Sequence, residues 1–199
     1  FMLFQPTSTF RSVSENLLFL REICADGYTP VSFLKMMPYS GTMVEMELRK
    51  EGRLNGRPGF QDYNFPDGSM DYYYEFITEC FMEWLRAGNG VLNIIKWARN
   101  YISVFFKFFG ISPEIRVISD NLKNITSDSN IFILDILHEL DILFESGKYN
   151  NGNDDCLIKY RELIIMKQEI YKKQINDIIL EIAAHYHYHK YLQPLHNRI

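Results

Sequence analysis

The sequence predicts an α/β fold that is followed by a mostly helical C-terminal region. Over residues 1 to about 66, short apolar runs alternate with amphipathic stretches, which is typical of parallel strands joined by helices. After residue 67, apolar residues recur only at helical spacing, and from Asp155 to Gln193 there is neither Gly nor Pro. We therefore predict two domains, residues 1–66 and residues 67–199.

The first βα unit occupies residues 1–27. The run "FMLF" is fully apolar and is closed by Gln5 and Pro6, as expected of a buried parallel strand. The stretch "STFRSVSENLLFLREICADG" then predicts a helix that Ser8 or Thr9 can cap and that ends before Gly27. Its apolar positions lie at helical spacing: Val13, Leu17, Leu20 and Cys24.

The second βα unit begins with "TPVSFLKMMP", a strand rich in apolar and β-branched residues. The turn "YSGT" follows, and "MVEMELRKEG" predicts a short charged helix. Right-handed crossovers between such units place the two strands parallel to each other. The stretch "RLNGRPGFQDYNFPDG" is predicted as a loop because turn residues punctuate it throughout: Gly56, Pro58, Gly59, Pro66 and Gly68.

Four helical segments are predicted beyond residue 67. The first carries one apolar stripe between Met70 and Leu85 and is broken by Gly88 and Gly90. The segment 88–110 has the length of a bilayer span, but its cations, Lys96 among them, make insertion unfavourable by roughly 2.5 to 3.5 kcal/mol each. A buried helix is the better interpretation, and a helix on a membrane surface is the alternative. Helices are also predicted over 131–145 and 155–193.

Composition excludes several function classes. The net charge of −4, with acids and bases mixed along the chain, favours no nucleic-acid partner. The three cysteines are widely spaced and odd in number, which is typical of a reducing cytosol and predicts a cytoplasmic protein. His185 and His189 share a helix face, yet no further ligand lies close in sequence, so we expect no metal site there.

The ends of the two predicted strands form the candidate site. In parallel α/β folds, ligands bind beyond the C-terminal ends of the strands. Backbone N–H groups from Ser40 to Met43, at the start of a helix, can hold a carboxylate or a phosphate, and Gly41 allows close approach. The predicted binding residues are Gln5, Pro6, Tyr39, Ser40, Gly41 and Thr42. Two ordinary βα turns are the alternative interpretation.

Lys35 is a second candidate on the later strand. Strand alternation places Lys35 on the same face as Phe33 and Met37, where its side chain would line the interior on the substrate side. A lysine at a strand end that reaches solvent is the alternative.

These residues resemble part of a known family. The string "FMLFQPTSTFRSVSENLLFL" is similar to a strand F-x-x-F-x-P-x-[ST]-T followed by a helix with E-N-x-x-F-L. "PYSGT" with "EMELRKEGRL" is similar to a strand end P-[YL]-x-G-T followed by E-x-x-L-x-x-x-G-R-L. Both patterns are found in the latter half of the catalytic barrel of radical S-adenosylmethionine proteins, and the match covers about residues 1–75. The closest likeness is to the subgroup with an upstream cobalamin-binding domain.

The resemblance implies a partial (βα) barrel, with about two parallel strands, and a helical extension. It also implies a 4Fe–4S cluster and S-adenosylmethionine as cofactors, with cobalamin as a further candidate. The family's CxxxCxxC motif is absent, so the cluster ligands are not in this chain and its catalytic residues are unknown. We therefore expect an enzyme fragment that is inactive alone and whose partner is a preceding part of the same chain. The substrate is not predicted.

A non-enzymatic function is the alternative interpretation. The helical region after residue 67 would then be an interaction module without catalytic activity, which binds a partner protein or self-associates through its long C-terminal helix. The edge of the short sheet is a second place for self-association. A membrane-surface protein with no transmembrane segment is the third interpretation.

Overall fold

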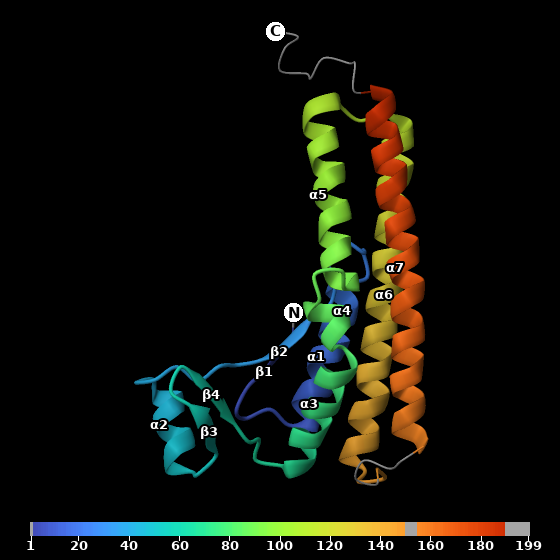
Figure 1. Ribbon diagram of the computed structural model, residues 1–199. Helices are drawn as coiled ribbons and strands as arrows, with labels where there is room; N and C mark the ends of the chain where they lie inside the picture. Colours follow the sequence, from blue (N-terminus) through green and yellow to red (C-terminus); the bar gives the residue numbers. More distant parts are fainter. Residues whose placement is uncertain (1, 150–154, 190–199) are drawn as a thin grey trace.

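A bundle of long helices carries two small sheets on one side (Figure 1). The computed structural model describes residues 2–149 and 155–189. Within these residues the predicted helical C-terminal region is confirmed. The described sheets have only two strands each, so the structure does not show a barrel.

The first two strands pair in parallel, as predicted. β1 (Met2–Phe4) lies beside β2 (Phe33–Lys35), with Met2 opposite Phe33 and Phe4 opposite Lys35. β2 is shorter than the apolar run that predicted it. The two strands are joined by α1 (Phe10–Ile23), whose N-cap is Thr9 in a capping box with Ser12.

The segment after β2 differs from its prediction in one respect. α2 (Met43–Lys50) forms as expected and is capped by Thr42. Residues 54–63, predicted as loop, form an antiparallel hairpin of β3 (Leu54–Arg57) and β4 (Phe60–Tyr63). The prediction was wrong because the turn residues Gly56 and Gly59 lie within and beside the strands of a tight hairpin, where both have positive φ.

The next stretch contains three helices. The single stripe predicted from Met70 to Leu85 is divided into α3 (Gly68–Cys80) and α4 (Met82–Arg86), which meet at Phe81. α5 (Val91–Phe109) starts after Gly90 and buries one face, as the buried-helix interpretation predicts. In the part of the chain that is described, no helix is both long and apolar enough to cross a bilayer.

Two very long helices complete the bundle. α6 (Pro113–Glu145) begins well before the predicted segment 131–145. Its first half was missed because the buried positions Thr126, Ser129 and Asn130 are polar and interrupt the apolar stripe. α7 (Asp155–His189) confirms the predicted C-terminal helix, and residues 190–193 of that prediction lie outside the described residues.

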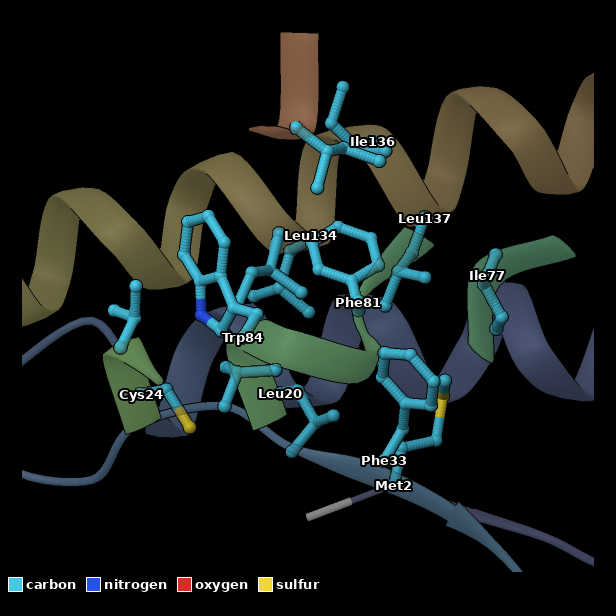
Figure 2. Close-up of a cluster of buried hydrophobic side chains, with 14 of the residues drawn as sticks. Met2, Leu20, Cys24, Phe33, Ile77, Phe81, Trp84, Leu134, Ile136 and Leu137 are labelled. Atoms are coloured by element: carbon cyan, nitrogen blue, oxygen red, sulfur yellow. The ribbon is translucent and has the colours of Figure 1, made fainter. Parts of the chain in front are cut away.

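One hydrophobic core connects the strands to the helical bundle. Met2 and Phe33 of the parallel pair point toward Phe81, while Trp84 lies between Cys24 and Leu134 (Figure 2). The strand face that carries Met2, Phe4 and Phe33 is therefore covered by helices. The opposite face carries Leu34, which is 40% exposed.

Candidate functional site

The parallel pairing of β1 and β2 brings two polar turns to the same edge of the sheet. We call residues 5–9 and 38–42 the C-terminal edge. The first turn is closed locally, because the Gln5 backbone N–H donates to Ser8 Oγ at 2.9 Å and the Ser8 N–H donates to the Gln5 carbonyl at 2.9 Å. Pro6 is buried, whereas Gln5 is exposed.

The second turn presents open backbone. The Thr42 N–H and hydroxyl both donate to the Tyr39 carbonyl, at 3.2 and 2.7 Å, and Thr42 Oγ1 accepts from the Glu45 N–H at 3.3 Å. Gly41 has a φ of +82°, and a Cβ there would meet no atom within 4 Å. The N–H groups of Ser40 and Gly41 have no acceptor among the described residues. The turn can therefore offer these two donors to an anionic or carbonyl group.

Lys35 is on the face that strand alternation predicts, but that face is not open. Its ammonium group lies 4.5 Å from the centre of the Tyr63 ring, 4.8 Å from that of Phe65 and 5.5 Å from that of Tyr74. It also pairs with Asp62 Oδ1 at 2.8 Å and donates to the Tyr63 carbonyl. The side chain is 13% exposed. The side chain of Lys35 therefore packs under the hairpin and does not contribute to the surface formed by the two turns.

The hairpin also fastens the C-terminal edge. The Tyr63 hydroxyl donates to the Phe4 carbonyl at 2.7 Å. Burial raises the pKa of Tyr63 above its usual value, so this hydroxyl stays a donor at neutral pH. Arg53 Nη1 donates to the carbonyls of Pro6 and Asn64 at 3.0 and 2.7 Å. Arg53 belongs to the E-x-x-L-x-x-x-G-R-L pattern and Tyr63 does not, but the sequence predicted the hydrogen bonds of neither residue because their acceptors are backbone atoms.

The opposite edge of the sheet is attached to the bundle. The loop between α1 and β2, residues 24–32, passes over α6, and Asn130 binds it at three points. Asn130 Oδ1 accepts from the Val31 N–H at 2.7 Å, while Nδ2 donates to the carbonyls of Cys24 and Thr29 at 3.1 and 2.9 Å. Arg99 adds a hydrogen bond of 2.7 Å to the Gly27 carbonyl. Helices therefore occupy the N-terminal edge of the sheet.

The described cysteines do not fit an iron–sulfur cluster. Cys24 and Cys80 are buried in the core, and Cys156 is partly exposed on α7. No group of three potential metal ligands occurs in residues 2–149 and 155–189. His185 lies 3.2 Å from Ser112 Oγ through its Nε2, and the side chain of His189 lies outside the described residues.

Six of the seven predicted site residues follow the C-terminal ends of the two parallel strands. Gln5 and Pro6 follow β1, Tyr39, Ser40, Gly41 and Thr42 follow β2, and Lys35 is held apart. The scan of known protein families and the searches of curated proteins and solved structures returned no significant match.

Proposed function

We propose that this chain is the C-terminal part of a radical S-adenosylmethionine enzyme, an oxidoreductase or methyltransferase. The observation that carries the proposal is the parallel register of β1 and β2, which sets both polar turns at one edge. In parallel α/β architectures this edge is where ligands bind. The segments that form it are the same ones that resemble the family.

The uncovered sheet face supports the idea of a larger barrel. Parallel strands are normally covered on both faces and paired on both sides. Here each strand of the pair has one strand neighbour among the described residues, and Leu34 is exposed on the face without helices. Further strands, supplied by a preceding part of the same chain, would cover that face and extend the sheet. Residues 1–66 would then belong to the barrel and residues 67–199 to its helical extension.

The position of the helical extension is compatible with a cofactor site. Asn130 and Arg99 bind the loop at the N-terminal edge, so the bundle does not compete for the turn at Ser40 and Gly41. In the parent protein these two N–H groups would orient S-adenosylmethionine or the substrate. A 4Fe–4S cluster bound by upstream cysteines would supply the electron that cleaves this cofactor, and cobalamin stays a second candidate cofactor.

The first test is the reading frame that encodes the protein. We expect it to continue upstream of Phe1 and to contain CxxxCxxC. The longer protein, loaded anaerobically with iron and sulfide and then reduced, should form 5′-deoxyadenosine from S-adenosylmethionine. A start codon immediately before Phe1, or a loaded protein that forms no 5′-deoxyadenosine, would contradict the proposal.

Two glycines give a matched pair for the role of the turn. Gly41 and Gly52 flank α2, both have positive φ, and a Cβ added at either position would meet no atom within 4 Å. Gly41→Val should reduce 5′-deoxyadenosine formation at least tenfold, because a branched side chain would block approach to the adjacent N–H groups. Gly52→Val introduces the same kind of backbone strain at positive φ but lies away from the C-terminal edge. It should leave the rate of 5′-deoxyadenosine formation within about twofold of wild type. Equal effects of the two substitutions would remove the turn from the site.

A groove in the helical region favours a second candidate, a self-associating module. α5 and α7 enclose an apolar groove of about 410 Å³, with Tyr101 and Val104 on one wall and Tyr186 on the other. Trp97 is exposed beside Tyr101, with ring centres 6.3 Å apart. If a second copy covers this groove, the chain should sediment as a dimer and Val104→Glu should return it to a monomer. A wild-type chain that remains monomeric at high concentration would exclude this candidate.

A further inference from the structure

A second cavity lies among the helices, where α3 meets the end of α6 and the start of α7. Its volume is about 200 Å³. The lining includes Tyr72 and Phe76 of α3, Phe144 of α6 and Tyr149, which follows α6. We call this cavity the aromatic cleft. Tyr72 is exposed at its mouth and Phe144 is buried at its base.

The rings of the aromatic cleft form a continuous wall. Phe144 and Tyr149 stack with ring centres 4.3 Å apart and planes inclined by 29°. Phe76 lies 6.0 Å from Phe144, and Tyr72 lies 6.3 Å from Tyr149. The faces of such rings carry negative electrostatic potential, which attracts a cation within about 6 Å of the ring centre.

Charge in the aromatic cleft is also negative on balance. Glu75 and Glu79 lie on the lining face of α3, and Arg161 of α7 is opposite. Arg161 pairs with Glu79 at 3.0 Å and stands 5.8 Å from the centre of the Phe76 ring. Glu75 has no cationic partner among the described residues. The cleft therefore already accommodates one protein cation and has one carboxylate left for another.

We propose that the aromatic cleft binds a methylated ammonium group. Aromatic faces and a nearby carboxylate attract the positive charge of such a group. A methylated ammonium also fits an apolar lining better than an unmethylated ammonium, which is strongly hydrated. Leu157 and Ile158 of α7 supply further apolar lining. This inference is independent of the radical enzyme proposal, because the cleft is built only from elements of the helical region.

Choline and its uncharged isostere 3,3-dimethyl-1-butanol separate charge recognition from plain apolar binding. We expect titration of the full chain, followed by NMR of aromatic side chains, to show saturable binding of choline. Binding of the isostere should be at least tenfold weaker. Tetramethylammonium should bind as well, and a peptide with trimethyllysine tests whether the ammonium is presented by a small molecule or by a protein. Binding of both choline and the isostere with equal affinity would overturn the proposal, as would no binding of any ammonium probe.

Two exposed positions give variants that should fold. Glu75→Gln removes the unpaired carboxylate and should weaken choline binding about fivefold, and Tyr72→Leu removes an aromatic face and should weaken it by a similar factor. Glu22→Gln on the exposed side of α1 is the matched control and should leave binding unchanged. Unchanged binding in both cleft variants would place the ligand elsewhere and refute the assignment.

Discussion

Asp141 is a carboxyl group that the fold buries near the end of α6. Its side chain is 2% exposed, and Oδ1 has no hydrogen-bond partner among the described residues. Burial raises the pKa of Asp141 from 3.8 to about 7, and the charge of Glu145 contributes in the same direction. The folded state therefore prefers the protonated form.

This residue should make stability depend on pH. Between about pH 4 and pH 7 the folded chain keeps the Asp141 proton while the unfolded chain has released it, so the free energy of unfolding falls as the pH rises. The loss from this group amounts to about 4 kcal/mol at most. Asp141→Asn should flatten the decrease, as measured by urea unfolding at pH 5 and pH 8. Asp177→Asn, on the exposed face of α7, is the control and should retain the wild-type slope.

At Gly27, the backbone conformation and the close approach of α6 require glycine. Its φ is +68°, and a Cβ would lie 2.1 Å from the carbonyl oxygen of Lys123 on α6. Gly147 has a similar φ of +65° but open space around it. Gly147→Ala should therefore lower the free energy of unfolding by about 1 kcal/mol, and Gly27→Ala by at least about 3 kcal/mol. Similar losses in thermal or urea unfolding would show that the loop can move away from α6.

At the scale of elements, local sequence patterns were sufficient to predict several of the helices and the first strand. The apolar run "FMLF", the Thr9 cap and the turn at Gly41 predicted β1, α1 and the start of α2 correctly. The first half of α6 was missed because two of its buried residues are polar: Asn130 binds a loop almost a hundred residues earlier in the chain, and Thr126 contacts Arg99 of α5. Such contacts leave no periodic signal in the sequence.

The placement of the two turns could also be predicted from the sequence. Parallel pairing follows from the alternation of strands and helices, so the sequence could predict that Pro6 and Gly41 follow strands that end at the same edge of the sheet. The hairpin that covers Lys35 was not, because Asp62 and Tyr63 lie in a stretch dominated by turn residues. Hydrogen bonds from Arg53 to backbone carbonyls were equally hidden, since any residue can supply the acceptor.

The attachment of the loop 24–32 to α6 should depend on a single side chain. Asn130 is 2% exposed, and its replacement by Ala leaves the Val31 N–H and the carbonyls of Cys24 and Thr29 without partners. We expect Asn130→Ala to lower the free energy of unfolding by about 3 to 5 kcal/mol. Hydrogen exchange of the Val31 amide should accelerate in parallel.

Asn121→Ala, on the exposed side of α6, is the control for this effect. Its free energy of unfolding should stay within about 0.5 kcal/mol of wild type. If Asn130→Ala behaved like Asn121→Ala, the loop would be held by Arg99 and Ser127 alone, through their bonds to the carbonyls of Gly27 and Ala25.

The whole molecule presents a parallel sheet with one uncovered face. Leu34 is exposed on the face without helices, and an exposed apolar side chain on a short sheet favours association. We expect the chain to self-associate with rising concentration and Leu34→Glu to suppress this association in sedimentation velocity experiments. Leu180→Glu, an exposed position on α7, should not.

Sedimentation of these variants also separates the two functional candidates. Suppression by Leu34→Glu and not by Val104→Glu assigns the contact to the sheet, which agrees with an incomplete barrel. The reverse result assigns it to the groove between α5 and α7. A chain that sediments as a monomer at every concentration would contradict association through either surface.

Because Cys24 is buried, its reactivity should depend on local opening of the fold. This thiol belongs to the first residue of the loop 24–32, whose backbone carbonyl accepts from Asn130 Nδ2, and burial raises the pKa of Cys24 and so suppresses its thiolate form. A thiol-specific reagent can modify Cys24 only after that segment lifts away from α6. The rate of Cys24 labelling therefore reports how often the loop 24–32 separates from α6 in the wild-type protein.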